Sequence, residues 1–272
     1  MAMAKELIKI AAVQMVSTPV LEQNFATARR LIQEAAGRGA QLVLLPEYWP
    51  VMGMHETDKI GCAEHAGAGP IQACMADMAR DCGVWLIGGT LPMVAPEADK
   101  VLNTTLVFDP AGEQIARYDK IHLFGFTKGD ESYDEARTIT PGSKVASFDA
   151  PFGKVGLSVC YDLRFPELYR ALGDCTLTVV PAAFTYTTGR AHWEILLRAR
   201  AIENQCYILA AAQGGHHPNG RRTWGHSMLI DPWGEIKDVL AEGEGVVIGD
   251  IEPHHFQGVR ESLPALRHRK LK

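Results

Sequence analysis

The amino-acid sequence predicts an α/β fold built as one domain over residues 1–272. Short apolar runs rich in Val, Ile and Leu alternate with longer segments of helical spacing along almost the whole chain, an alternation typical of α/β proteins. No Pro/Ser-rich linker, low-complexity tract or short repeat divides the chain. We therefore expect a single domain.

The first half of the chain contains two expected helices between short strands. Asn24 is expected to cap a helix over residues 25–37 that ends at Gly37. Pro70 stands at the start of a second helix over residues 71–80, where proline is tolerated. The expected strands are 8–15, 41–47, 84–89, and a hairpin of 102–108 with 113–119 across the turn Asp109-Pro110-Ala111-Gly112.

The second half begins with residues 124–142, a charged, glycine-containing stretch that we expect to be a long loop of functional importance. A strand over 154–159 leads to a helix that begins at Pro166. Residues 252–272 are basic at their end and are expected either to pack on a partner subunit or to form a solvated tail. The remaining elements are strand 177–180, helix 192–205, strand 207–212, and the strand pair 227–231 and 235–239.

The composition indicates an ordinary globular protein and argues against several partners. The 272 residues are 47% apolar and 22% charged, and the net charge of −5 argues against nucleic acid and against an anionic membrane surface. No run approaches the roughly 20 apolar residues that a membrane span needs. The N-terminal segment carries Lys5, Glu6 and Lys9 and lacks a cleavage pattern, so we do not interpret it as a signal peptide.

Cysteine and histidine usage points to free thiols and no metal site. The spacings of the cysteines fit neither a zinc site nor a compact disulfide framework, so we expect a reducing, cytoplasmic setting. The pairs His216-His217 and His254-His255 lack metal-ligand spacing, and we interpret them as solvated loop residues. The six cysteines are Cys62, Cys74, Cys82, Cys160, Cys175 and Cys206.

Three expected strands end in residues that could form one nucleophilic site. Cys160 stands between the strand 154–159 and the helix at Pro166, where unpaired N–H groups and the helix dipole favour thiolate. Glu47 ends the strand 41–47, and Lys120 follows the strand 113–119. Because ligands gather at the carboxyl ends of strands in α/β proteins, we expect these three side chains to meet.

Three short segments carry a resemblance to a known family. They are Leu45-Pro46-Glu47, Tyr118-Asp119-Lys120-Ile121-His122-Leu123 and Val159-Cys160-Tyr161-Asp162-Leu163-Arg164-Phe165-Pro166-Glu167. Together they resemble the nitrilase superfamily of carbon–nitrogen hydrolases over essentially the whole chain. The resemblance implies a four-layer α-β-β-α sandwich whose subunits usually pair, and hence a homodimer or higher homo-oligomer.

The resemblance also implies that Glu47, Lys120 and Cys160 form the catalytic trio. A further glutamate is typical of the family shortly before a Pro-Gly ahead of the nucleophile strand. Glu135 fits this placement, and Glu131 fits it less well. A solvated loop carboxylate is the alternative interpretation of Glu135.

Each of these residues has an expected chemical role. Glu47 would take the proton of the Cys160 thiol as the sulfur attacks an amide carbon. Lys120 and the backbone N–H of Tyr161 would hold the oxyanion, and Lys120 would also lower the pKa of Cys160. Glu135 would orient either Lys120 or the incoming water. This chemistry needs no metal or organic cofactor.

The segment from Cys160 to Glu167 is similar to the amidase branch of the superfamily rather than to true nitrilases. The resemblance implies hydrolysis of a small, carboxylate-bearing 2-oxo acid amide through a thioester, with deaminated glutathione giving 2-oxoglutarate and Cys-Gly. The alternatives are α-ketoglutaramate or another small amide, and the charged loop 125–133 leaves this choice open. A non-catalytic scaffold is a third alternative, against which the intact trio argues.

Three further residues are candidates for substrate binding. Arg164 is expected to bind the substrate carboxylate, although it could instead pair with Asp162 or Glu167 and brace the turn. Thr188 is a candidate for a hydroxyl contact. Tyr48 is expected to wall the pocket, with a role in the core as the alternative.

Overall fold

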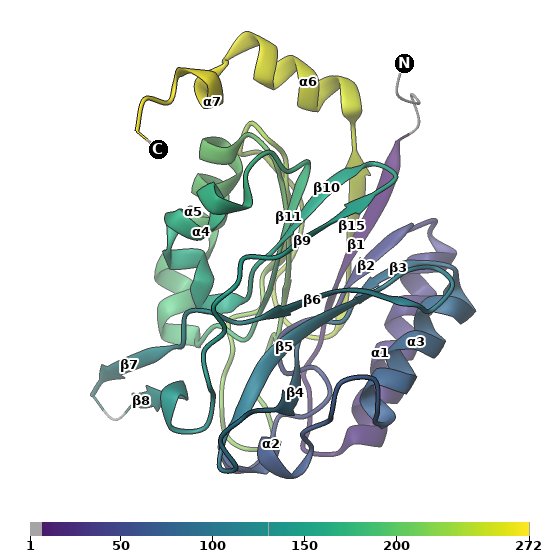
Figure 1. The fold of residues 1–272 in the computed structure, drawn as a ribbon, viewed down its shortest axis with the longest axis vertical. Coiled ribbons are helices and arrows are strands. Elements are labelled where there is room, and N and C mark those ends of the chain that lie inside the picture. Colours follow the sequence, from purple (N-terminus) through teal and green to yellow (C-terminus); the bar gives the residue numbers. More distant parts are fainter. Residues whose placement is uncertain (1–6, 130, 272) are drawn as a thin grey trace.

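The computed structural model describes residues 7–129 and 131–271. Two large β-sheets pack face to face, and helices cover the outer face of each sheet (Figure 1). The helices α1 (Leu21–Gly37) and α3 (Pro70–Cys82) cover one sheet, whereas α4 (Pro166–Leu172) and α5 (Tyr186–Asn204) cover the other. The expected four-layer α-β-β-α sandwich is confirmed.

The two sheets differ in size and in strand direction. The first sheet has seven strands in the order β15-β1-β2-β3-β5-β4, with β6 paired to β5. These strands are β1 (Ile8–Gln14), β2 (Leu42–Leu44), β3 (Trp85–Ile87), β4 (Leu91–Val94), β5 (Val101–Phe108), β6 (Gln114–Asp119) and β15 (Gly245–Ile251). The second sheet has six strands in the order β14-β13-β12-β11-β10-β9. These are β9 (Ser147–Ala150), β10 (Gly153–Leu157), β11 (Leu177–Ala182), β12 (Tyr207–Ala212), β13 (Ser227–Ile230) and β14 (Ile236–Leu240).

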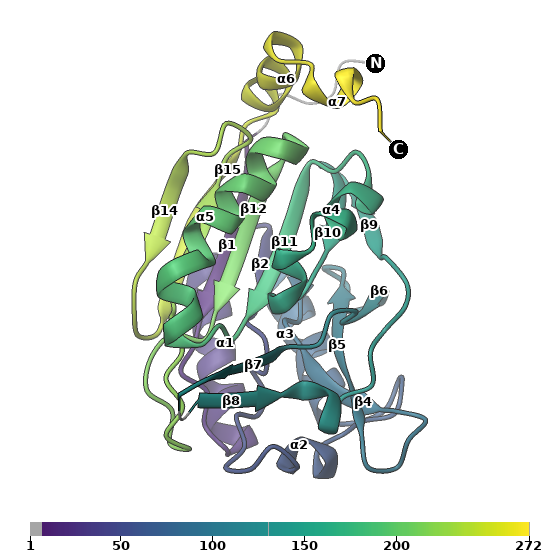
Figure 2. The ribbon, with the colours of Figure 1, turned by 90° about the vertical axis from the view of Figure 1, so that its left-hand side faces the viewer.

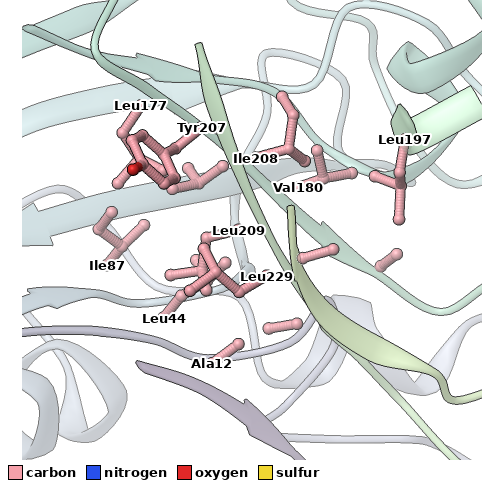
Figure 3. Close-up of a cluster of buried hydrophobic side chains, with 14 of the residues drawn as sticks. Ala12, Leu44, Ile87, Leu177, Val180, Leu197, Tyr207, Ile208, Leu209 and Leu229 are labelled. Carbon is pink, nitrogen blue, oxygen red and sulfur yellow. The ribbon is translucent and has the colours of Figure 1, made fainter. Parts of the chain in front are cut away.

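The main core lies between the two sheets. Side chains alternate along the strands, so Leu44 faces the second sheet while its neighbour Val43 faces the helices α1 and α3. Figure 3 shows Leu44 and Ile87 of the first sheet close to Leu209 and Leu229 of the second. The strands β11 and β12 are buried along their whole length, with α5 packed against β12, and burial on both faces explains their continuous apolar sequence.

The central strands of each sheet are parallel. β1, β2 and β3 run in one direction in the first sheet, and β10, β11 and β12 do so in the second. Their carboxyl ends lie at the end of the sandwich occupied by a hairpin of β7 (Gly125–Lys128) and β8 (Glu131–Asp134) (Figure 2). The short helix α2 (Asp58–Gly61) lies at the same end.

Two expected helix starts are wrong. α1 begins at Leu21, four residues before the expected start, and Asn24 does not cap it. Asn24 instead lies inside the first turn, where its side chain accepts from Thr18 N at 2.8 Å and donates to Pro50 O at 2.9 Å. α5 begins at Tyr186 rather than at residue 192, because the Thr185 hydroxyl accepts from Thr188 N at 3.3 Å and caps the helix there.

The stretch 124–142 is more ordered than the expected loop. It contains the β7–β8 hairpin and the short helix η1 (Glu135–Arg137). The strands β4, β9 and β15 were not predicted from the sequence, and the nucleophile strand β10 ends at Leu157, two residues early. Cys160 therefore opens a separate one-turn helix, η2 (Cys160–Arg164).

The C-terminal segment is helical and packs on its own chain. It forms α6 (Pro253–Ser262) and α7 (Ala265–His268) at the end of the sandwich opposite the β7–β8 hairpin (Figure 2). Arg260 of α6 donates from Nε to Gln205 O at 2.9 Å and from Nη2 to Cys175 O at 2.8 Å. The expectation of a wholly solvated tail is therefore wrong for α6.

Candidate active site

A buried cluster of charged side chains lies where the carboxyl ends of the central strands meet. Glu47 follows β2, Lys120 directly follows β6, and Cys160 follows β10. Glu47 is 1% exposed, Lys120 is 0% exposed and Cys160 is 7% exposed. Charged groups this deeply buried require partners, and these side chains supply them to one another.

Glu47 is held by donors from three elements. Its Oε1 accepts hydrogen bonds from Lys120 Nζ and from Asn103 Nδ2, both at 2.9 Å. Its Oε2 accepts from the backbone N–H of Ala183, which directly follows β11, at 2.9 Å. The carboxylate is thus fixed between the two sheets.

Lys120 bridges Glu47 to a second carboxylate. Its Nζ donates to Glu135 Oε1 at 3.0 Å and to Glu135 Oε2 at 2.8 Å. Burial alone would lower the pKa of Lys120, but the carboxylates of Glu135 and Glu47 outweigh burial and raise this pKa well above its usual value. Lys120 is therefore an ammonium at neutral pH.

Glu135 is tied to the pocket wall as well as to Lys120. Its Oε1 accepts from the Tyr48 hydroxyl at 2.7 Å, and its Oε2 accepts from the backbone N–H of Phe124 at 2.7 Å. Burial would raise the pKa of Glu135, but Lys120 and these hydrogen bonds hold it below its usual value. Glu131 lies elsewhere, because its Oε2 accepts from the Thr187 hydroxyl at 2.7 Å.

Cys160 has an unusual backbone conformation. Its φ of +50° lies in the left-handed region, and Tyr48, next to Glu47, has a φ of +56°. Residues other than glycine adopt such angles at a cost of about 1–3 kcal/mol and often at functional sites. The N–H of Tyr161 donates to no acceptor among the described residues, which leaves it available beside the thiol.

The expectation that Cys160 is surrounded by groups favouring thiolate is wrong. Burial and the neighbouring carboxylate of Glu47 raise the pKa of Cys160 well above its usual value, and Lys120 offsets this only in part. The reason is the number of charges, because Cys160 is close to two carboxylates and one ammonium. The resting thiol is therefore neutral, and a base must take its proton.

A cavity of about 430 Å³ lies next to this cluster. We call it the inner cavity; Tyr48, Phe124, Tyr133, Glu135 and Arg221 are among the residues that line it. Glu47, Lys120 and Cys160 do not line its wall, but the hydrogen bonds from Tyr48 to Glu135 and from Lys120 to Glu135 connect them to it. Tyr48 thus lies in the wall of the inner cavity, and its expected contact with substrate stays a prediction.

Arg164 lies beside the nucleophile without either expected carboxylate partner. Its guanidinium carbon is 5.7 Å from the centre of the Tyr161 ring, and its Nη1 is 3.2 Å from His192 Nδ1. Asp162 is instead occupied by Tyr118, whose hydroxyl donates to Asp162 Oδ2 at 2.7 Å. Arg164 makes no ion pair within the described parts of the chain.

Thr188, the remaining candidate for substrate binding, belongs to α5. It is buried in the first turn of α5, and its hydroxyl lies 2.9 Å from the Thr185 hydroxyl. The described residues provide no contact between Thr188 and the Glu47–Lys120–Glu135 cluster. Its expected substrate contact stays a prediction.

Asn103 and Ala183 are the site residues that sequence reasoning missed. The signal for Asn103 was an uncharged polar residue within the apolar run of β5, where it is 2% exposed. Ala183 contributes only its backbone N–H, which no side-chain pattern reveals.

His217 does not lie in a solvated loop, contrary to expectation. It is 4% exposed, with Nδ1 2.9 Å from Ser17 O and Nε2 2.8 Å from the Thr223 hydroxyl. Burial lowers its pKa, so the ring is neutral near pH 7. No group of three His, Cys, Asp or Glu side chains within residues 7–129 and 131–271 is arranged to hold a metal ion.

Comparison with known proteins places this chain in a family. The chain is 44% identical over 266 residues to the deaminated glutathione amidase of Synechocystis sp. (strain PCC 6803 / GT-S), covering 95% of this chain and 97% of that protein. It is 37% identical over 270 residues to Omega-amidase NIT2-A of Xenopus laevis, covering 96% and 95% of the two chains. The chain also resembles the crystal structure of Saccharomyces cerevisiae Nit3, a member of branch 10 of the nitrilase superfamily. The TM-score is 0.87 and the sequence identity is 28%, and the match covers 100% of this chain and 99% of that chain. Residues 9–261 match the carbon-nitrogen hydrolase family model, and the chain belongs to that family.

Proposed function

We propose that this carbon–nitrogen hydrolase is a cysteine-dependent amidase that converts deaminated glutathione to 2-oxoglutarate and Cys-Gly. The observation that carries the chemistry is the buried Glu47–Lys120–Glu135 chain beside the neutral thiol of Cys160. The deaminated glutathione amidase at 44% identity supports the substrate.

Acylation begins with a proton transfer. Glu47 takes the proton of the Cys160 thiol as the sulfur bonds to the amide carbon, and the carbonyl oxygen becomes an oxyanion. The Lys120 ammonium and the Tyr161 N–H stabilise this oxyanion. One such donor typically changes the rate by about 10²–10³-fold. The carbon–nitrogen bond then breaks, and Glu47 returns the proton to the leaving nitrogen, which leaves a thioester on Cys160.

Deacylation repeats the proton transfers with water. Glu47 takes a proton from the water as its oxygen bonds to the thioester carbon, and Lys120 again faces the oxyanion. The carbon–sulfur bond breaks, the acid leaves, and Cys160 recovers the proton from Glu47. Glu135 supports both steps because it is the second carboxylate that binds the Lys120 ammonium.

Recognition of the acyl group requires a cation for the carboxylate of the 2-oxo acid. Arg164 provides one, since its guanidinium lies next to the Tyr161 ring and has no carboxylate partner among the described residues. Thr188 supplies a hydroxyl from the first turn of α5. Tyr48 forms part of the cavity wall and bonds to Glu135.

The alternative substrate is α-ketoglutaramate, which shares the acyl group and releases ammonia instead of a dipeptide. The Xenopus laevis Omega-amidase NIT2-A at 37% identity supports this alternative. The two substrates give the same acyl-enzyme, so the leaving group alone separates them.

The first experiment compares the two substrates directly. Release of 2-oxoglutarate from deaminated glutathione and from α-ketoglutaramate is measured side by side, with Cys160→Ala as the control. We expect a higher kcat/KM for deaminated glutathione and loss of both activities in the variant. A preference for α-ketoglutaramate would replace the proposed substrate, and an active Cys160→Ala would overturn the nucleophile.

We also propose that residues 1–272 form one domain that self-associates in the cytoplasm. The pairing of β1 with β15 joins the two ends of the chain and supports the single domain. Free thiols at all six cysteines support the reducing setting.

The self-association is supported by an exposed apolar surface that pairing would cover. Ile195 and Ile202 on α5 are 70% and 49% exposed, and Trp233 is 54% exposed. Light scattering on Ile195→Asp, which we expect to be more monomeric than the parent, tests the self-association.

A further inference from the structure

A second cavity lies outside the inner cavity and shares part of its wall. This outer cavity of about 480 Å³ is lined by Tyr186, Arg222, Tyr133 and Arg221 among others. Tyr133 and Arg221 line both cavities. The two cavities are therefore neighbours, with Arg221 in the wall of each.

Each arginine has one carboxylate in ion-pair range that it does not hydrogen-bond. Arg221 Nη1 is 3.6 Å from Glu56 Oε1, and Arg222 Nη2 is 3.6 Å from Glu242 Oε1, both beyond hydrogen-bond range. Neither guanidinium donates a hydrogen bond to an acceptor in residues 7–129 and 131–271. The Nε of Arg222 is buried and also unpartnered within these ranges. These are cations with unused donors.

The segment that carries them is fixed in place. Asn219 Nδ2 donates to Gly53 O at 2.7 Å, and Asn219 Oδ1 accepts from Arg221 N at 3.0 Å. The carbonyl of Arg222 accepts from Tyr186 N at 3.2 Å, which ties the segment to the start of α5. Anchoring of this kind reduces the entropy lost when a ligand binds.

Aromatic rings orient both guanidinium groups. The Arg222 guanidinium carbon lies 3.7 Å from the centre of the Tyr186 ring, and that of Arg221 lies 5.4 Å from the centre of the Tyr133 ring. Stacking holds a guanidinium in one plane and leaves its edge free for a bidentate contact with a carboxylate.

The charges favour an anion in the outer cavity and disfavour one in the inner cavity. Charged groups lining the inner cavity are Glu56, Asp99, Asp134, Glu135, Arg137 and Arg221, an excess of carboxylates. The outer cavity has two arginines and one carboxylate, Glu131, whose Oε2 is already bonded to the Thr187 hydroxyl at 2.7 Å. A carboxylate is therefore stabilised more in the outer cavity than in the inner one.

We propose that Arg221, with Arg222 beside it, binds the C-terminal carboxylate of a peptide leaving group and so selects peptide amides over free amides. This inference rests on the proposed function. With the scissile carbonyl at Cys160, a two-residue leaving group in extended form spans roughly 7 Å. An amide that releases ammonia has no group that could reach these residues.

The test varies the leaving group while the acyl group stays the same. The substrates are deaminated glutathione, its C-terminal amide and α-ketoglutaramate, with release of 2-oxoglutarate as the common signal. We expect the parent protein to prefer deaminated glutathione over its C-terminal amide by about tenfold or more in kcat/KM, the effect of a hydrogen bond to a charged group.

Two variants locate the preference. Arg221→Ala should abolish the preference for deaminated glutathione over its C-terminal amide, by raising the KM for deaminated glutathione about tenfold. Arg222→Ala should reduce this preference. Both variants should change kcat/KM for the C-terminal amide and for α-ketoglutaramate by less than about twofold. Arg38→Ala, which removes an exposed arginine at the end of α1, is the matched control. Glu56→Gln, which removes the carboxylate beside Arg221, should keep the preference.

The outcomes separate this inference from the proposed function. Equal kcat/KM for deaminated glutathione and its C-terminal amide in the parent protein would overturn the carboxylate site and leave the amidase intact. A preference that persists in both arginine variants would do the same. A parent protein that hydrolyses α-ketoglutaramate but not deaminated glutathione would overturn the proposed substrate, and this inference with it.

Discussion

Asn103 donates a 2.9 Å hydrogen bond from Nδ2 to Glu47 Oε1, the oxygen that Lys120 also reaches. The backbone carbonyl of Asn103 accepts from Lys120 N at 3.0 Å. One residue of β5 therefore positions both the proposed base and the proposed oxyanion donor. Its Oδ1 is buried without a partner among the described residues, so the carboxylate alone fixes the orientation of the amide.

Replacing Asn103 by Ala should lower kcat about tenfold and leave KM nearly unchanged. The variant removes a donor that positions the Glu47 carboxylate, so the loss should appear in kcat and not in KM. Thr105→Ala in the same strand is the control, because it removes a buried hydrogen bond to Gly89 O without touching the cluster. A variant that loses stability but keeps its kcat would show that Asn103 has only a structural role.

Tyr48→Phe tests the link between the pocket wall and Glu135. Glu135 would keep its bonds to Lys120 and Phe124 N, so we expect a fall in kcat of only about threefold to tenfold. Glu135→Gln should cost at least about tenfold more than Tyr48→Phe, because it leaves Lys120 with Glu47 as its only carboxylate partner among the described residues. Equal effects of the two variants would indicate that Glu135 acts only through Tyr48. Melting temperatures of both variants separate these effects from unfolding.

The sequence predicted the residues of the site better than their contacts. Glu47 and Cys160 end or follow apolar strands and Lys120 follows a more polar one, and ligands gather at the carboxyl ends of strands in α/β proteins. The pKa direction of Cys160 could not be predicted, because it depends on the number of carboxylates that meet in space. The donors from Asn103 and Ala183 were missed for a similar reason, since they come from strands distant in sequence. The start of α5 was missed because its first turn is polar.

Glu135 should also affect stability in acid. Burial would raise the folded-state pKa of Glu135, but the ammonium of Lys120 outweighs burial and lowers this pKa. The charged form of Glu135 therefore stabilises the fold above the unfolded pKa of about 4.3. This contribution should disappear as the pH falls through the lower folded-state pKa. Urea unfolding between pH 6 and pH 3 should therefore show a shallower loss of stability in Glu135→Gln than in Glu113→Gln, a matched change at an exposed turn. Identical slopes would contradict the lowered pKa.

His217 should make the fold sensitive to mild acid. Ser17 O can only accept, so Nδ1 carries the proton and Nε2 accepts from Thr223. Protonation would turn Nε2 into a donor inside a buried site, consistent with the lowered pKa. That pKa lies below the unfolded value of about 6.5. His217 should therefore make its full contribution to the stability of the fold above pH 6.5 and a smaller one at lower pH. NMR titration should give His217 a pKa below about 6.5, and a higher value would contradict this.

Glu47→Gln should change two reactivities of Cys160 in opposite directions. Hydrolysis should fall by about 10²–10⁴-fold, because the variant has no group to take the thiol proton or return it to the leaving nitrogen.

Alkylation of Cys160 by iodoacetamide, in contrast, needs only the thiolate. Burial remains in the variant, but the largest carboxylate contribution to the raised pKa of Cys160 is gone while Lys120 stays. Each unit by which this pKa falls gives about tenfold more thiolate, reduced to about threefold in rate because a less basic thiolate is a weaker nucleophile. Alkylation of Cys160, followed by peptide mass spectrometry at pH 7.5, should therefore become faster in Glu47→Gln and stay unchanged in Glu113→Gln. If alkylation slowed together with hydrolysis, Glu47 would have to favour the thiolate in the resting site, and the neutral thiol inferred from its burial and its two carboxylate neighbours would be wrong.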